Sequence, residues 1–320
     1  MQCQACNSQQ FEVLESHLDD ALPFSLRKCL NCGLFETGDL LVTSSSLPYR
    51  RFNNPLEIVL KFARLWRAFL INLKFRAIVG ELSVFDYGCG RGEFINFLKK
   101  KGWKTLGCEV NERSALEAKS LVLVVLFPKN EGEIVLLRCP KNSISLITAI
   151  HVLEHLGNPK DFLFASRESL SKNGYLLIEV PNILSLQSQI SGLRWVHLDV
   201  INHRFHFSLN SLINLLDESG LVIESVRMFS IQYGVFGMID TLSIQLLRGR
   251  ESCWSRISKK GNYLINILTL LEISVLFFPA FVLEAFACYK KRGGVLRIVA
   301  KNANIESNSF DITSSINAKL

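Results

Sequence analysis

The stretch VFDYGCGRGEF, residues 84–94, lies at the centre of the predicted fold. It is typical of an apolar strand that ends near Asp86, followed by a turn with three glycines and by the start of a helix. Glycines in such a turn let the backbone approach a ligand closely, and the free N–H groups at a helix start attract an anionic group. The stretch therefore predicts a ligand-binding site at the carboxyl end of a buried strand.

An acidic residue at the end of the next apolar run strengthens this prediction. Glu109 closes the run LGCE at 106–109 and follows Gly90 by 19 residues. In doubly wound sheets, an acid about 20 residues after the glycine turn binds ribose hydroxyls. Together the two features predict that Glu109 holds a ribose, and the pair is more specific than either feature alone.

Short apolar runs alternate with helical patterns from about residue 82 onward, as expected for a doubly wound sheet. Seven strands are predicted, within residues 82–87, 104–110, 120–127, 143–150, 174–180, 221–229 and 295–301. The run EIVLLRC at 133–139 is an equally good candidate for the third strand. Helices are predicted at 93–101, 111–119, 159–171 and 209–219. The predicted fold class is α/β, with a Rossmann-like doubly wound, mostly parallel seven-stranded sheet.

Two Cys-x2-Cys pairs precede this region, namely Cys3 with Cys6 and Cys29 with Cys32. Four thiolates from two such turns can converge tetrahedrally on one Zn²⁺. A short segment without a large apolar core needs a cross-link of this kind to fold. A site closed by four cysteines predicts a structural zinc ion in a small zinc ribbon. The alternatives are four unrelated surface thiols and a ribbon that reads nucleic acid, although the segment lacks the aromatic and basic run of a stacking platform.

At the glycine turn the sequence resembles a known family. DYGCGRGEF followed by GCEV resembles the cofactor site of class I S-adenosylmethionine-dependent methyltransferases. The resemblance continues through AIHVLEHLGNP and YLLIEVPN, and covers residues 82–230 plus the last strand. It implies methyl transfer with S-adenosyl-L-methionine as cofactor. It also implies that Glu109 takes the ribose and that further cofactor contacts come from Asp86, Gly88, Cys89, Gly90 and His151.

The cysteine module, with the segments IEVPN and HFS, is similar to methyltransferases associated with bacterial surface polysaccharide and sugar biosynthesis. This similarity implies a sugar or glycan acceptor, free or lipid-linked, and oxygen is the preferred acceptor atom. Two departures from the family are visible. The fourth strand opens with Ile144-Ser145 instead of Phe-Asp, and residues 126–141 lack the adenine-contacting acid. These departures leave a cofactor-dead binding or scaffold subunit as an alternative.

The run HVLEH, residues 151–155, matches the inverted zinc-protease motif H-x-x-E-H. That motif needs a long helix, whereas Gly157-Asn158-Pro159 breaks regular structure directly afterwards, so we reject a zinc protease. At the carboxyl end of the fourth strand, the run lies where doubly wound sheets bind ligands. With a second group of histidines after the fifth strand, it predicts His155 and His203 as catalytic residues that accept a hydroxyl proton. A packing or capping role for His155 is the alternative.

The chain has 320 residues, of which 48% are hydrophobic and 20% charged, and a formal net charge of +7. This composition excludes disorder and suits an anionic partner, so an RNA methyltransferase is a further alternative. The start shows no signal peptide, which predicts a cytoplasmic protein. The predicted divisions are a cysteine module at 1–46, an amphipathic helical linker or cap at 47–80, a methyltransferase domain at 81–302 with an apolar insertion at 231–292, and a disordered tail at 303–320.

Residues 263–289, YLINILTLLEISVLFFPAFVLEAFACY, are the most hydrophobic part of the chain and have basic flanks. Glu272, Glu284 and Pro279 disfavour a simple transmembrane span. The alternatives are an interfacial or re-entrant hairpin, a helical cap on the enzyme or a partner, and a true span. We expect this segment to meet a lipid-linked acceptor or an anionic membrane, peripherally and at its inner face. Nucleic acid is not an expected partner.

Overall fold

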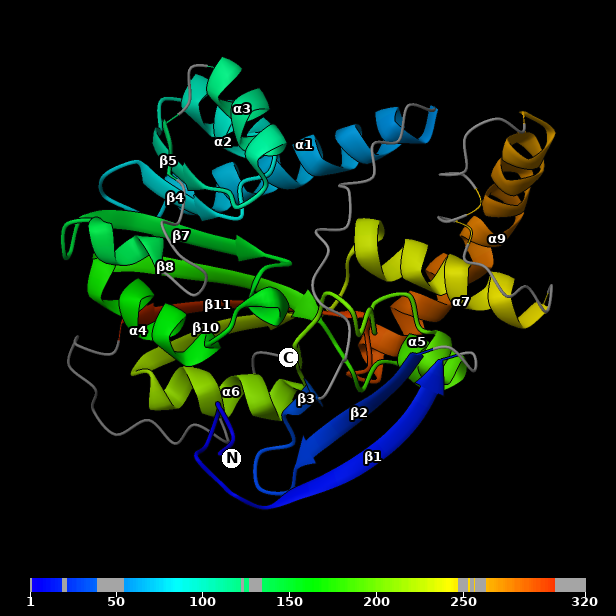
Figure 1. Cartoon of the computed structure of the whole chain (residues 1–320). Helices are drawn as coiled ribbons and strands as arrows, with labels where there is room; N and C mark the ends of the chain where they lie inside the picture. Colours follow the sequence, from blue (N-terminus) through cyan, green and yellow to red (C-terminus); the bar gives the residue numbers. More distant parts are fainter. Residues whose placement is uncertain are drawn as a thin grey trace.

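The computed structural model describes residues 2–18, 22–38, 55–121, 124–126, 134–246, 253, 256 and 263–302 (Figure 1). Seven strands form one sheet in the order β10-β11-β8-β7-β4-β5-β6. Neighbours from β8 to β6 are parallel, and β11 is antiparallel to both β8 and β10. The predicted sheet is therefore confirmed. Its strands are β4 Ser83–Tyr87, β5 Lys104–Cys108, β6 Val124–Leu126, β7 Ile144–Ile150, β8 Leu170–Pro181, β10 Leu221–Arg227 and β11 Val295–Asn302.

Helices cover both faces of this sheet, because alternate side chains of each strand point to opposite faces. On one face, Val84 of β4 packs with Phe75 of α1 and Leu98 of α2. On the other face, Phe85 packs in the cluster that contains Phe162 of α4 and residues of α6. The helices of these layers are α1 Pro55–Arg76, α2 Glu93–Lys100, α3 Glu112–Ser120, α4 Pro159–Ser169 and α6 Leu209–Glu218.

Several of the predicted boundaries change. The helix predicted at 159–171 ends at Ser169, because Leu170 already begins β8. Residues 135–138 of the run EIVLLRC form the short 3-10 helix η1 (Val135–Arg138), so this run is not the third strand. The predicted helical linker at 47–80 is the single helix α1, which begins at Pro55. Residues 47–54 and the tail 303–320 lie outside the described residues.

The cysteine module forms a second sheet that the sequence pattern does not predict. Strands β1 (Phe11–Leu18), β2 (Leu22–Cys29) and β3 (Phe35–Gly38) are antiparallel, and β3 also pairs with β9 (Phe205–His206). Because β9 belongs to the long connection after β8, the module shares a sheet with the domain built on the seven-stranded sheet. Its cysteines also pack in the same apolar cluster as Phe162.

Within the described residues, the apolar insertion contains one π-helix and two α-helices. Helix α9 (Tyr263–Tyr289) is continuous through Pro279, so the re-entrant hairpin is wrong. One side of α9 packs against α7 (Phe236–Leu246) through an apolar cluster that includes Ile273 and Ala280. Within the described residues, Ile267–Tyr289 is the one helix long and apolar enough to cross a membrane, with a mean hydropathy of 2.0, although length and composition alone do not establish a span.

Glu284 anchors α9 to the domain built on the seven-stranded sheet. Its side chain is completely buried and accepts hydrogen bonds from Gly294 N at 2.8 Å and from Gln187 Nε2 at 2.9 Å. Gln187 belongs to the short helix α5 (Leu186–Ser191), and Gly294 immediately precedes β11. This acid, which disfavours a membrane span in the sequence, therefore fixes α9 at the edge of the sheet.

Candidate active site

The glycine turn follows β4 directly and lies at the carboxyl edge of the parallel strands. Gly88 adopts a φ of 75°, and a Cβ there would lie 2.5 Å from Val152 Cγ2. A side chain is therefore excluded both by the left-handed backbone and by the loop after β7. Helix α2 begins immediately after Gly92 without a side-chain cap, which leaves its first N–H groups available to an anionic group.

Glu109 lies against this turn, at the end of β5. Its Oε2 accepts a hydrogen bond from Gly90 N at 2.8 Å, and its Oε1 accepts one from Asn111 N at 2.7 Å. The structure thus brings together the turn and the acid that the 19-residue spacing predicts as partners. One carboxylate therefore supports the glycine turn from the end of β5.

Asp86 and Cys89 occupy different environments beside the same turn. Asp86 is buried and accepts a hydrogen bond from Thr148 Oγ1 at 2.6 Å; burial raises its pKa to about 7. Cys89 packs its side chain in an apolar cluster with Ile95, and its backbone N–H donates to Cys108 O. The side chain of Cys89, predicted as a cofactor contact, is therefore directed into the core.

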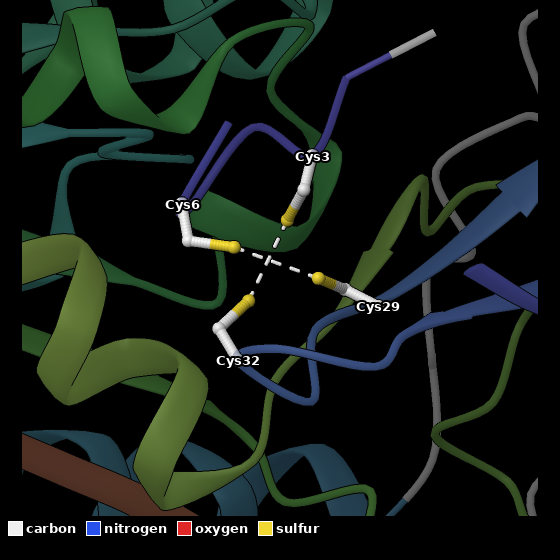
Figure 2. A group of neighbouring side chains, drawn as sticks. All are labelled: Cys3, Cys6, Cys29 and Cys32. Carbon is white, nitrogen blue, oxygen red and sulfur yellow. Dashed lines mark hydrogen bonds between the residues drawn. The ribbon is translucent and has the colours of Figure 1, made fainter. Parts of the chain in front are cut away.

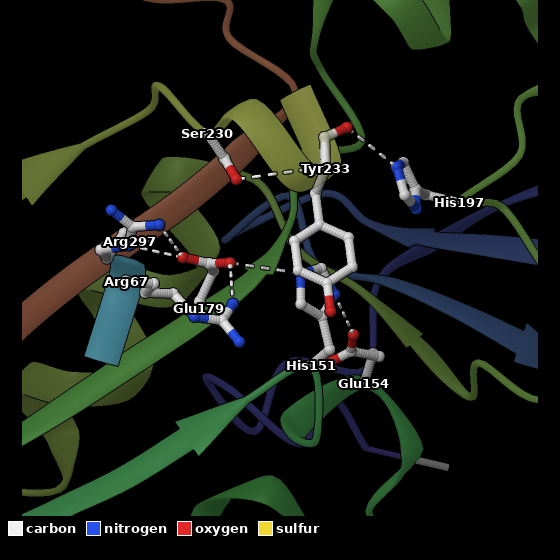
Figure 3. A network of polar contacts seen from close by, with 8 residues as sticks. All are labelled: Arg67, His151, Glu154, Glu179, His197, Ser230, Tyr233 and Arg297. Carbon is white, nitrogen blue, oxygen red and sulfur yellow. Dashed lines mark hydrogen bonds and ion pairs between the residues drawn. The ribbon is translucent and has the colours of Figure 1, made fainter. Parts of the chain in front are cut away.

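His151 belongs to a buried network of polar side chains behind the turn (Figure 3). Its Nδ1 lies 3.2 Å from Glu154 Oε1 and its Nε2 lies 3.5 Å from Glu179 Oε1. The ring of Tyr233 covers the imidazole, with ring centroids 3.7 Å apart. Tyr233 lies on the π-helix η4 (Ile231–Val235), so the apolar insertion closes one side of the site.

Glu179 is the central acid of this network, and the sequence prediction missed it. It is completely buried on β8, where Arg67 of α1 and Arg297 of β11 pair with it. Burial would raise the pKa of Glu179, but Arg297, His151 and Arg67 lower it well below its usual value. Burial would lower the pKa of His151, but Tyr233, Glu154 and Glu179 raise it to about 10.

His151 therefore lies between two buried carboxylates, and its contact with the cofactor stays a prediction from the resemblance. A lone acid within the apolar run YLLIEVP is the signal that could have identified Glu179.

The two predicted catalytic histidines lie together, although 48 residues separate them. Their rings are 4.7 Å apart, with His155 on the 3-10 helix η2 (Leu153–His155) and His203 on the connection before β9. His155 Nδ1 lies 2.9 Å from Asn202 O, and His203 Nδ1 lies 2.9 Å from His197 O. Because a carbonyl oxygen only accepts, each Nδ1 carries the hydrogen and each Nε2 carries a lone pair.

Glu154 lies beside these two rings and is 1% exposed. Burial would raise its pKa, but the hydrogen bond from His151 and the neighbouring histidines lower it below the usual value. Burial lowers the pKa of His203, which keeps that ring neutral. The short helix η2 confirms that HVLEH does not form the long helix of a zinc protease.

The four predicted zinc ligands form one cluster (Figure 2). Cys3 Sγ lies 3.5 Å from Cys32 Sγ, Cys6 Sγ lies 3.5 Å from Cys29 Sγ, and all four sulfurs lie within 4.8 Å of one another. Four thiolates on a common Zn²⁺ at about 2.3 Å require separations of this size. The cysteines therefore fit a closed structural zinc site, in which the ion would supply cross-linking and no open position for a substrate.

The departure at Ile144-Ser145 lies far from the cofactor edge along its strand. These residues open β7, and Ser145 Oγ lies 3.1 Å from Ser83 Oγ at the start of β4. The glycine turn follows the opposite end of β4, so the missing framework acid does not remove a group from the turn. Of the segment 126–141, where the adenine-contacting acid is expected, residues 127–133 lie outside the described residues.

A cleft of about 450 Å³ lies beside this site, between α1 and strands β8, β10 and β11. Its walls are mainly apolar, with Trp66, Leu70 and Phe229 among them, and four basic side chains also line it: Arg67, Lys74, Arg227 and Arg297. Arg67 and Arg297 connect the cleft directly with Glu179.

Comparisons with known proteins find one matching family model and a number of similar solved structures. The family model described as "Methyltransferase domain" matches residues 57–226. A SAM-dependent methyltransferase from Archaeoglobus fulgidus is 19% identical over 78% of this chain and 100% of its own, with a TM-score of 0.48. One from Mesorhizobium loti is 15% identical over 76% of this chain and 100% of its own, with a TM-score of 0.45. No curated protein matches the sequence.

Proposed function

We propose that this chain, which belongs to the methyltransferase-domain family and is an S-adenosylmethionine-dependent enzyme, methylates a hydroxyl of a sugar or glycan. The proposal rests mainly on the pair His155 and His203, whose Nδ1 atoms donate to backbone carbonyls, so that each neutral ring keeps its lone pair on Nε2. A hydroxyl becomes a better nucleophile when a neighbouring base accepts its proton. The pair supplies such a base at the edge of the sheet where the cofactor would bind.

The cofactor would be held by the turn at Gly88 and Gly90, by Glu109 at the ribose and by Asp86 at the methionine part. S-adenosylmethionine supplies an activated methyl group when it is bound. The acceptor oxygen then forms a bond to the methyl carbon while the carbon–sulfur bond breaks and its electron pair returns to sulfur. His155 or His203 receives the hydroxyl proton.

A lipid-linked form of the acceptor is supported by the apolar cleft and its basic side chains. The cleft lies next to Arg67 and Arg297, which pair with Glu179 within the same network as His151. Its apolar walls would accommodate a hydrocarbon chain, whereas Lys74 and Arg227 would favour an anionic group at the linkage. We expect the enzyme to act in the cytoplasm, at the inner face of the membrane.

Isotope transfer from the cofactor tests this function. The full chain is incubated with S-adenosylmethionine that carries a deuterated methyl group and with separated fractions of cell glycans, lipids and RNA. We expect mass spectrometry to find the deuterated methyl group on a sugar oxygen in the glycan or lipid fraction. Label on RNA alone would overturn the sugar acceptor and support the RNA methyltransferase, whereas no binding of the cofactor would support a scaffold subunit.

Two histidine variants make the test specific to the base. His203→Gln should abolish transfer while cofactor binding persists. His17→Gln serves as the matched control, because His17 lies on β1, outside both loops that carry the pair. Transfer that survives in a double His155→Gln, His203→Gln variant would remove the histidine pair from the reaction.

A further inference from the structure

We propose that Glu154, His155 and His203 form a second metal site, which binds a divalent transition-metal ion next to the acceptor side of the active site. One carboxylate oxygen and one ring nitrogen from each histidine lie within 4.8 Å of one another. Small side-chain rotations would bring the three atoms to about 2.0–2.2 Å from a common centre, the usual distance from zinc to nitrogen or oxygen ligands. This inference deepens the proposed function, because it concerns the same two histidines.

Glu154 provides an independent observation that points to a ligand. Its Oε1 contacts His151 Nδ1, whereas its Oε2 is buried and has no hydrogen-bond partner among the described residues. Leaving a buried acceptor unsatisfied costs about 1–3 kcal/mol, and more when the group is charged. A cation bound to Oε2 would satisfy this oxygen and neutralise a carboxylate that is 1% exposed.

The hydrogen bonds at the two histidines match those of metal ligands. A ligating histidine usually donates its other ring N–H to a carbonyl or carboxylate, which fixes the tautomer and the orientation of the ring. Here His155 Nδ1 donates to Asn202 O and His203 Nδ1 donates to His197 O. Both Nε2 atoms are therefore oriented with their lone pairs available.

Backbone contacts join the two loops that carry the three ligands. Arg204 N donates to Glu154 O at 2.9 Å, and His203 N donates to Asp199 O at 2.8 Å. The hydrogen bond from His155 Nδ1 to Asn202 O also joins the loop after β7 to the connection after β8. The ligand set is therefore positioned by the fold, which lowers the free-energy cost of ordering it on metal binding.

The donor set indicates the class of metal and what the ion does. Two imidazoles and one carboxylate suit Zn²⁺ or another first-row divalent ion, and three protein ligands leave a position open for a substrate oxygen. His155 is exposed, so the open side faces solvent. An acceptor hydroxyl bound there would lose its proton to solvent more readily, because a divalent cation lowers the pKa of a bound oxygen donor. The histidines would then act as ligands instead of direct bases.

The test measures metal directly, so its result does not depend on methyl transfer. The full chain is dialysed against Zn²⁺, and bound zinc is counted by elemental analysis. We expect about two ions per chain, one at the thiolates and one at the histidine site. With Co²⁺ as probe, the cysteine site should give thiolate-to-cobalt charge-transfer absorption. The histidine site has no thiolate, so it should add only weaker visible bands and no charge-transfer absorption.

Three variants assign the second ion. Glu154→Gln and His203→Gln should each lose one ion per chain and the added visible bands, but keep the thiolate absorption. His155→Gln replaces an exposed side chain, so its metal content can be measured even if the variants at buried positions fail to fold. His17→Gln, on β1, is the matched control and should keep both ions. A wild-type chain that binds only the thiolate ion, or a His155→Gln chain with unchanged metal content, would overturn the second site whatever the acceptor is.

Discussion

Thr37 Oγ1 and His206 Nε2 lie 2.8 Å apart and join the cysteine module to the connection that carries His203. The contact is reinforced by pairing of β3 with β9, in which Phe35 is opposite His206. Thr37 Oγ1 also donates to His203 O at 3.1 Å. The cysteine module therefore supports the loop that carries His203.

Loss of the structural zinc should destabilise the chain beyond the module itself. Replacing Cys29 and Cys32 by Ser removes two of the four thiolates, and zinc binding of this kind contributes about 10–16 kcal/mol of apparent free energy. We expect loss of the thiolate-bound ion and a lower midpoint of urea unfolding. Cys139→Ser is the matched control, because Cys139 is a free cysteine outside the cluster. Zinc content and unfolding that match the wild type would contradict the assignment.

Replacing Glu109 by Ala should weaken cofactor binding. The change removes the acceptor of Gly90 N and Asn111 N, and it removes the charged partner predicted for the ribose. A hydrogen bond to a charged group contributes about 1.5–3 kcal/mol, so the Kd for S-adenosylmethionine should rise about 10- to 150-fold. Calorimetric titration measures this. Glu112→Ala, at an exposed position on the following helix, should bind normally; equal affinities of the two variants would refute the role of Glu109.

The ionisation of Asp86 should make stability fall as the pH rises from about 4 to about 7. Burial raises the pKa of Asp86 from 3.8 to about 7, so the folded chain holds this proton more tightly than the unfolded chain across that range. The free energy of unfolding therefore decreases with pH there, by at most about 4 kcal/mol at about 1.36 kcal/mol per pKa unit.

Asp86→Asn isolates this effect, because the amide oxygen can still accept from Thr148 but does not titrate. We expect the variant to gain stability relative to the wild type as pH rises, and to lose this advantage at low pH. Urea unfolding of both proteins at about pH 5 and about pH 8 measures the change in their difference. If the difference in unfolding free energy between the variant and the wild type is the same at both pH values, Asp86 is ionised in the folded chain at both.

Helix α9 should hold the enzyme at an anionic membrane surface. Its outer side exposes an apolar stripe that includes Val275 at 73% and Phe278 at 74%. Lys290, Lys291 and Arg292 follow the helix, and each basic residue near an anionic surface contributes about 1 kcal/mol. Arg256, in the other basic flank, instead pairs with Glu272 at 2.9 Å. We expect the full chain to co-sediment with anionic vesicles at low salt, and less at high salt.

Substitutions on the stripe separate membrane binding from a packed cap. Val275→Glu with Phe278→Glu should release the chain from the vesicles without affecting its fold, because both side chains are exposed. Leu137→Glu is the control, since Leu137 is 72% exposed on η1, away from α9. A wild-type chain that stays in the supernatant with anionic vesicles at low salt would show that α9 is a structural cap.

Local pattern determined the scaffold of this protein. The apolar runs that become β4, β5 and β7 are short enough and apolar enough to be identified from neighbouring residues alone, and the glycine turn follows directly from VFDYGCGRGEF. Spacing along the chain also identifies Glu109, which follows Gly90 by 19 residues. The four cysteines are identified by their two Cys-x2-Cys turns, each of which spans few residues. In each of these cases the partners are set by local geometry.

Tertiary structure alone decided how the polar groups of the site are paired. Glu179 acquires its role from Arg67 and Arg297, which lie 112 and 118 residues away along the chain. His203 meets His155, and β9 meets β3, only because the connection after β8 folds back over the loop after β7. Hydrophobic periodicity specifies which side of a strand or helix is buried, but it carries no information about which distant polar group will be buried against it.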